Sequence, residues 1–232
     1  MQNHNENEIP RIECSANGHA ALYVDGKEFF MLAGEVHNSV SSDLEYMDQF
    51  VWKQIEELPL NTLLVPIHWE QIEKTKGVFD FEIPRRIINR ARAAEIRLVF
   101  LWFGLWKNGA SNYVPSWVKG DSTQYFRAVH KSGAPSETVS PFCDKAVEAD
   151  ANAFAQFMKF LKEYDSDRHT VIMIQVENEV GFLGSERDFS KEAEGKFALE
   201  IPAAVQKLYQ VKGTWSEGFQ SEAPEYFMSW YV

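Results

Sequence analysis

Two glutamates and an asparagine, Glu177, Asn178 and Glu179, directly follow a six-residue run, 171–176, in which five residues are apolar. A short run rich in β-branched residues is typical of a buried parallel strand. Carboxylates at the mouth of such a strand are costly unless they are hydrogen-bonded or used in chemistry. The pattern therefore predicts either a catalytic or binding site, or a solvated strand end whose glutamates cap the next turn.

Polar or aromatic side chains also lie at the ends of three other predicted strands. They are Glu35 and His37 after residues 29–34, His68, Trp69 and Glu70 after residues 61–67, and Trp102 and Trp106 around the end of residues 97–103. In a barrel of parallel strands, catalytic side chains come from the carboxyl ends of several strands. We therefore expect these groups to converge on one site, although each tryptophan, His37 and His68 could instead be a core residue.

Apolar residues at helical spacing separate these strands and must position their ends. They predict helices over residues 45–58, 83–94 and 144–164, and two more over 197–209 and 223–232. This alternation predicts a parallel sheet with helices outside it. The glycine-rich phosphate loop of a doubly wound sheet is not found in the sequence. We therefore expect an α/β fold of the (β/α)8 TIM-barrel type, with about the first four β/α units in this chain.

The N-terminal part predicts two simpler elements. Residues 1–17 are expected to be a flexible tail. Residues 21–24 and 29–32 flank the pair Asp25-Gly26, which is typical of a tight β-hairpin turn. Residues 18–232 are then expected to form one partial barrel domain that a short β-hairpin precedes.

Composition excludes several classes of partner. The 232-residue chain has a formal net charge of −11, whereas nucleic acids and anionic membranes select basic surfaces. The two cysteines lack metal-site spacing, and a site made of Glu35, His37 and His68 matches no known ligand pattern. We expect no metal, no cofactor, no nucleic acid and no membrane partner.

A long connection, residues 105–142, is rich in aromatic residues and is expected to be functional.

The chain resembles the family 35 glycoside hydrolases, the retaining β-galactosidases built on a (β/α)8 barrel. The matching segments cover residues 24–27, 32–38, 61–73, 77–81, 106–109, 115–117 and 175–179. Asn178-Glu179 after a strand is a weak signal alone, but all of these segments in order are a specific one. Leu105 departs from the family, whose members often carry a small polar or acidic residue there, and this bears on the choice of sugar.

The resemblance implies a role for each matched residue. Glu179 looks like the general acid/base, and Asn178 looks like the residue that hydrogen-bonds the sugar 2-hydroxyl. Glu177 is expected to order the site rather than to react. The expected sugar-pocket residues are Glu35, Trp106, Lys107 and Asn108, with His37 and Trp69 in support.

Retaining hydrolysis needs two carboxyl groups about 5–5.5 Å apart, one acid and one nucleophile. Glu177 and Glu179 could not flank a sugar if both continued one strand, because they would be neighbours on one face. The family's nucleophile follows a later strand, and no matching segment occurs after Glu179. We therefore expect this chain to be the first half of a barrel, inactive alone, which a second chain or copy completes.

The resemblance thus implies a hydrolase that releases terminal β-galactose from oligosaccharides or glycoconjugates. Two alternatives stay open: another retaining β-glycosidase of the same clan, and a non-catalytic half barrel that only binds carbohydrate. Two compartments also stay open. The protein would be extracellular or periplasmic if a signal peptide was removed, and cytoplasmic otherwise.

Overall fold

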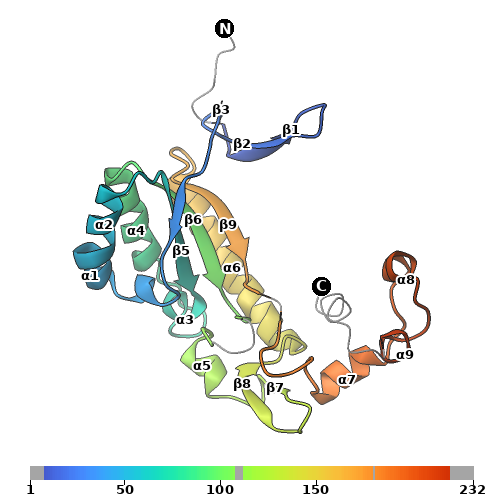
Figure 1. The fold of residues 1–232 in the computed structure, drawn as a ribbon. Helices are drawn as coiled ribbons and strands as arrows, with labels where there is room; N and C mark the ends of the chain where they lie inside the picture. The colour runs from blue at the N-terminus through green and yellow to red at the C-terminus, as the bar shows by residue number, and fades with distance from the viewer. Residues whose placement is uncertain (1–7, 108–111, 180, 220–232) are drawn as a thin grey trace. The chain divides into compact units, whose positions relative to one another are not determined.

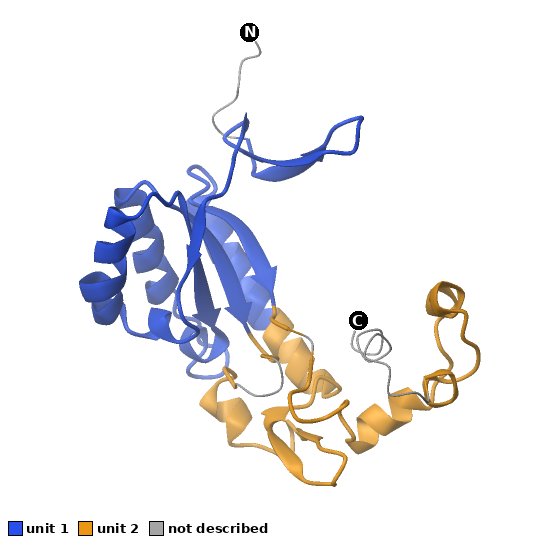
Figure 2. Ribbon diagram, in the orientation of Figure 1, with its two compact units in different colours: residues 1–103, 152–176 blue, residues 104–151, 177–232 orange. Residues whose placement is uncertain are grey.

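The computed structural model describes residues 8–107, 112–179 and 181–219. The chain divides into two compact units (Figure 2): unit 1 contains residues 1–103 and 152–176, and unit 2 contains residues 104–151 and 177–232. The predicted helix over 223–232 and the predicted site residue Asn108 lie outside the described residues.

Unit 1 is built on a four-stranded parallel sheet in the order β4-β5-β6-β9 (Figure 1). The strands are β4 (Ala33–Glu35), β5 (Thr62–His68), β6 (Arg97–Phe103) and β9 (Val171–Val176). Each neighbouring pair is parallel, with Thr62 opposite Arg97 and Phe100 opposite Ile174. The predicted α/β arrangement around a parallel sheet is therefore confirmed.

Strand β6 is buried on both faces, because apolar groups cover each side. On one face, the rings of Phe100 and Trp102 contact Phe157 of helix α6 (Asp144–Asp165), with centroids 5.8 Å apart in a tilted pair and 5.5 Å apart in a stacked pair, respectively. On the other face, Val99, Leu101 and Phe103 are also buried, and Phe103 stacks on His68 of the neighbouring strand β5 with ring centroids 5.9 Å apart. A strand covered on both faces reads as a continuous apolar run, and this explains the sequence of β6.

The helices of unit 1 follow the predicted apolar spacing. The predicted helix 45–58 is a continuous helical segment made of α1 (Leu44–Tyr46), a π-helical turn η2 (Met47–Val51) and α2 (Trp52–Glu57). Helix α4 (Glu82–Ala93) buries Ile87, Ile88 and Ala91. Two short helices, η1 (Val40–Ser42) and α3 (Trp69–Ile72), follow β4 and β5.

The N-terminal segment corrects two predictions. Residues 11–14 are not a tail, because they form β1 (Arg11–Cys14), which pairs antiparallel with β2 (Ala20–Val24). Asp25 and Gly26 form the predicted turn, with φ of 52° and 72°. Pairing resumes at once in β3 (Lys27–Glu28), so residues 29–32 are not the second hairpin arm.

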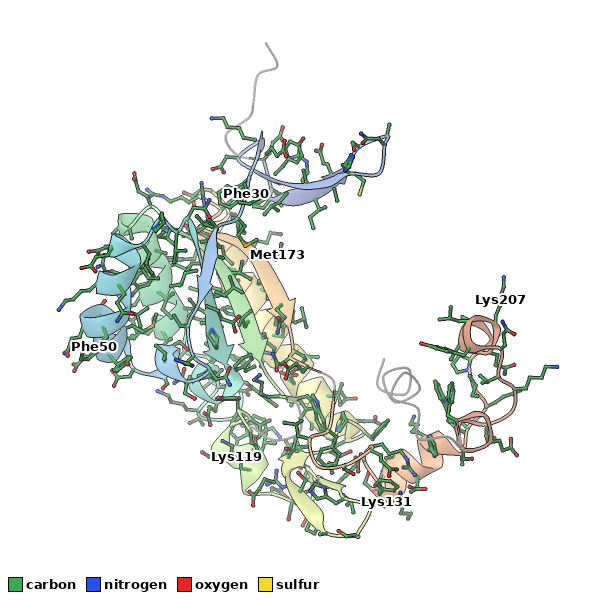
Figure 3. The ribbon with its side chains drawn as sticks, viewed as in Figure 1. Phe30, Phe50, Lys119, Lys131, Met173 and Lys207 are labelled. Atoms are coloured by element: carbon green, nitrogen blue, oxygen red, sulfur yellow. The ribbon has the colours of Figure 1, made fainter. Side chains whose placement is uncertain are left out.

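The side chain of Asn61 explains where residues 29–32 go instead. Its amide donates to the carbonyl of Phe30 at 2.8 Å, and its oxygen accepts the N–H of Leu32 at 2.8 Å. These bonds draw the segment from the hairpin to the start of β5, so that it enters the parallel sheet at β4. The side chain of Phe30 itself is 84% exposed (Figure 3).

Unit 2 contains short elements that the sequence pattern did not predict. The long connection after β6 contains α5 (Ser116–Lys119) and a hairpin of β7 (Arg127–Val129) and β8 (Pro135–Val139). The buried carboxylate of Asp188 fixes this hairpin, because it accepts the N–H of Val129 and the hydroxyl of Ser140 at 2.9 and 2.6 Å.

The C-terminal helices of unit 2 also differ from the prediction. The single helix expected over 197–209 is two helices, α7 (Lys191–Phe197) and α8 (Ala203–Tyr209). Pro202 stands at the N-cap of α8, and a proline cannot continue a helix from the preceding turn. Helix α9 (Trp215–Gly218) then packs Trp215 and Phe219 into a small cluster with Ile201. Among the described helices, none is long and apolar enough to cross a membrane.

Candidate active site

Glu177 turns the chain sharply at the end of β9. The strand ends at Val176, and Glu177 then has φ of 59°, in the left-handed region that a non-glycine residue rarely adopts. Such strain persists only where the surroundings fix it, and it is found preferentially at functional sites. The turn also means that Glu177 and Glu179 do not continue one strand.

The carboxylate of Glu177 anchors the segment that follows β6. Its Oε2 accepts the backbone N–H of Trp106 at 3.1 Å, and its Oε1 accepts the N–H of Leu105 at 3.3 Å. The N–H of Leu105 also donates to Oδ2 of Asp150, on helix α6, at 3.2 Å. Glu177 therefore bridges two segments of unit 2 that are about seventy residues apart in the sequence.

The carboxyl groups of Glu177 and Asp150 are close enough to hydrogen-bond to each other. Burial, the hydrogen bond with Asp150 and the charge of Asp150 raise the pKa of Glu177 from 4.5 to about 10. The N–H groups of Trp106 and Leu105 act in the opposite direction but do not outweigh these causes. Glu177 is thus protonated at neutral pH and ill suited to be a nucleophile.

Lys107 fixes the amide of Asn178. Its ammonium group donates a hydrogen bond to Oδ1 of Asn178, and the Lys107 residue is only 8% exposed. Because the cation binds the oxygen of the amide, it fixes which side of the amide group carries the NH2 donor. Asn178 is half-buried, and Glu179 is exposed.

Trp106 is packed more like a core residue than like a sugar platform. It is 6% exposed, its ring lies edge-on to Phe182 with centroids 5.7 Å apart, and its Nε1–H donates to the carbonyl of Gly181 at 3.2 Å. The indole thus ties the segment after β6 to the segment after Glu179. Asn108, the next predicted site residue, lies outside the part of the chain that the structure describes.

The remaining predicted site residues belong to unit 1. Glu35, at the end of β4, and His37 are exposed. Trp69 is completely buried, and its Nε1–H donates to Oε2 of Glu73 at 2.7 Å. His68 is buried as well, with Nε2 2.6 Å from the carbonyl oxygen of Asn38. Trp69, His68 and Trp102 are therefore core residues, the alternative considered for each from the sequence.

Sequence reasoning missed Asp150. The structure buries it on α6 in one stripe with Ala146, Ala153 and Phe157, at helical spacing. The sequence contained this signal, since an aspartate interrupts the inner face of an otherwise apolar helix. Buried carboxyl groups need a partner, and Glu177 is the partner here.

The site brings together four of the predicted residues, Trp106, Lys107, Glu177 and Asn178, by hydrogen bonds within unit 2. Its polar groups can hold and orient hydroxyl groups, and the exposed Glu179 can exchange protons with a ligand. Among the described residues, no group of three His, Cys, Asp or Glu side chains could hold a metal ion. The site is therefore suited to acid/base chemistry on a polyhydroxylated molecule.

Comparison with known proteins gives a family and a fold. The model of the glycosyl hydrolases family 35 matches residues 21–230. Among solved structures, the catalytic domain of a beta-amylase from Paenibacillus polymyxa is similar, with a TM-score of 0.55 and 15% identity over 86% of this chain. An exo-beta-1,4-mannosidase from Opitutaceae bacterium strain TAV5 has a TM-score of 0.49 and 14% identity over 79% of this chain.

This chain spans 58% of the beta-amylase chain and 28% of the mannosidase chain. No curated protein matches the sequence significantly. At 15% identity the likeness to the beta-amylase extends to the fold alone.

Proposed function

Because this chain belongs to the glycosyl hydrolases family 35, we propose that it supplies the acid/base side of the active site of a retaining β-galactosidase. The observation that carries the proposal is the segment after β9, where Lys107 orients Asn178 and Glu179 is exposed beside it. The substrate class is terminal β-galactosides of oligosaccharides or glycoconjugates. Glu35 and His37, at and after the end of β4, are proposed to take part in sugar binding, whereas Trp69 is proposed to act only through the stability of the core of unit 1.

Glu179 is the proposed general acid/base. In the first step it protonates the glycosidic oxygen, while a carboxylate nucleophile attacks the anomeric carbon and forms a glycosyl-enzyme. In the second step Glu179 removes a proton from water, which attacks the anomeric carbon and releases the sugar. An exposed side chain suits both steps, because it must reach the leaving group and then water.

Asn178 is proposed to bind the sugar 2-hydroxyl, and Lys107 to hold the amide in the correct orientation. Hydrogen bonds to this hydroxyl strengthen in the transition state and contribute to the rate. Since Lys107 occupies Oδ1 of Asn178, the amide meets the hydroxyl as a donor. Trp106 supports the pocket wall by packing on Phe182.

The nucleophile is proposed to come from the second half of a (β/α)8 barrel. Such a barrel closes with eight parallel strands. The parallel sheet in the described residues has four, with β4 and β9 at its edges. On β9, Met173 is 37% and Val176 61% exposed, which an additional strand and its helix would cover (Figure 3).

The isolated chain is therefore expected to be inactive, and further polypeptide or a second copy would complete the barrel. Size and turnover of the chain, measured by light scattering and with a chromogenic β-galactoside, test this expectation. A monodisperse monomer that hydrolyses the substrate would refute it.

The assembled enzyme tests the role of Glu179. Glu179→Gln removes the proton donor, so kcat/KM should fall by about 10²–10⁴-fold for alkyl β-galactosides, whose leaving groups need protonation. Activated aryl β-galactosides should lose much less. Glu192→Gln, a substitution of another exposed glutamate in unit 2, is the matched control and should leave both rates unchanged. Equal losses for the two substrate types would remove Glu179 from this role.

A second candidate is a retaining β-glycosidase for another sugar, and one residue favours it. Leu105 stands where family members often carry a small polar or acidic residue, and it is buried with an apolar side chain. It offers no side-chain hydrogen bond to a sugar hydroxyl. Rates on a panel of aryl β-glycosides that differ only in the sugar decide between the two.

A non-catalytic half barrel that binds carbohydrate is the third possibility. It would bind galactose, as measured by calorimetry, but the assembled protein would show no turnover of any β-glycoside.

A further inference from the structure

We propose that Asp150 is a positioning residue that shares one proton with Glu177 and thereby holds the turn carrying Asn178 and Glu179. This inference deepens the proposed function and rests on it for its catalytic meaning. Asp150 accepts the N–H of Leu105 and hydrogen-bonds to Glu177, so we place its effect on the turn through Glu177. Its helix, α6, is the element against which the turn is fixed.

The geometry requires a proton between the two carboxyl groups. The single N–H of Leu105 lies 3.2 Å from Oδ2 of Asp150 and 3.3 Å from Oε1 of Glu177, so both oxygens converge on one donor. One N–H cannot neutralise two adjacent charges in a buried place, where like charges repel strongly. A shared proton turns this repulsion into a hydrogen bond, and burial and the neighbouring Asp150 accordingly raise the pKa of Glu177.

A cation, Lys107, also contacts the turn that follows Glu177. Lys107, on the segment after β6, gives a hydrogen bond to the amide oxygen of Asn178. Asp150 from α6 and the N–H groups of Leu105 and Trp106 act directly on Glu177, and Lys107 acts on the neighbouring Asn178. Glu179, two residues further on, is exposed to solvent.

Glu177 has a backbone conformation that needs such support. Its φ of 59° is in the left-handed region, which a glutamate leaves readily unless its side chain is held. The bonds from Leu105 and Trp106 hold one edge of the carboxyl group, and Asp150 holds it from the helix. When both carboxyl groups are ionised, repulsion should drive Glu177 from this position and disorient Asn178 and Glu179.

The backbone N–H groups of Leu105 and Trp106 report the state of the pair directly. We would follow their ¹⁵N–¹H resonances against pH in the whole chain without sugar. In the wild type, both should shift together in one step at alkaline pH, far above the ordinary carboxyl value of about 4. A step at the ordinary value would overturn the proposal without any variant.

Two variants and a control sharpen the test. Asp150→Asn replaces the shared proton with an amide that donates to an ionised Glu177, so the alkaline step should disappear and any step should move down by at least about 2 pH units. Glu177→Gln should likewise remove the alkaline step. Glu148→Gln, an exposed position on the same helix, should keep the wild-type profile. An unchanged alkaline step in a folded Asp150→Asn chain contradicts the sharing of a proton.

If Asp150→Asn does not fold, Glu177→Gln and the wild-type profile still decide the question. The outcome is also separate from the proposed function. If the chain neither binds nor hydrolyses β-galactosides but shows the alkaline step, the proposed function is refuted and the shared proton is supported. If the enzyme depends on Glu179 as expected but shows no alkaline step, the proposed function is supported and the shared proton is refuted.

Discussion

The ends of strands β5 and β9 look alike in sequence, since each passes from a mainly apolar run to ionisable residues, but they differ in structure. After β5, Trp69 and Glu73 are within four residues of each other and form a hydrogen bond of 2.7 Å in the core. After β9, Glu177 finds its partners at Leu105 and Trp106, about seventy residues away. Asn178 and Glu179 stay accessible beside it.

The comparison shows that a polar strand end is not by itself evidence of a site. At β5 the indole N–H of Trp69 and the carboxyl group of Glu73 satisfy each other across the short helix α3 (Trp69–Ile72) and its C-cap. At β9 the strained turn at Glu177 and its raised pKa indicate that distant segments hold the residue in place. Strain and perturbed pKa values cluster at functional sites, which favours β9 as the reacting end.

The largest effect on stability should come from a substitution at the end of β5. Trp69→Ala removes a completely buried indole and leaves Glu73 without its donor, so it should lower the free energy of unfolding by about 3–5 kcal/mol. Sugar affinity per folded molecule should not change. Urea unfolding and NMR titration with galactose measure the two quantities. A variant with wild-type stability and weakened sugar binding would place Trp69 in the site.

The free energy of unfolding should depend on pH partly through Glu177, at the end of β9. The folded state keeps a proton on Glu177 that the unfolded state releases near its pKa of 4.5, because the folded pKa is about 10. The stabilising contribution of this proton is thus complete below pH 4.5 and is lost as the pH rises toward 10. Glu177→Gln should flatten this decline.

Urea midpoints of the wild type and of Glu177→Gln across this range measure the difference. Titrating groups that do not contact Glu177 contribute equally to both proteins, so their effects cancel and the difference reports the Glu177–Asp150 pair. Identical slopes for the two proteins would show that Glu177 titrates normally in the folded chain.

The smallest effect should come from Lys107→Met, which keeps the length of the side chain but removes its ammonium group. The amide of Asn178 then loses its orienting donor, and sugar binding should weaken by about 0.5–1.5 kcal/mol, the value of one hydrogen bond. Lys119→Met, in the short helix α5, is the control in the same unit. Calorimetry with galactose measures both. Equal affinities for the two variants would leave Lys107 without a role in binding.

The sequence by itself determined the parts of this protein that local pattern controls. Apolar runs located β5, β6 and β9, helical spacing located α4 and α6, and Asp25-Gly26 located the hairpin turn. The ordered motifs also identified the family, which the family model confirms over residues 21–230. These features depend on neighbouring residues, so the sequence contains their cause.

Only the tertiary structure decided which polar residues act together. Asp150 lies in the middle of a helix and meets Glu177 because α6 and the end of β9 are brought together by folding. Asn61, far along the chain from Phe30, likewise shortened the hairpin that local sequence extended to residue 32. Hydrogen bonds between distant segments have no periodic signature in the sequence, because either partner alone is only a polar residue on an otherwise apolar face.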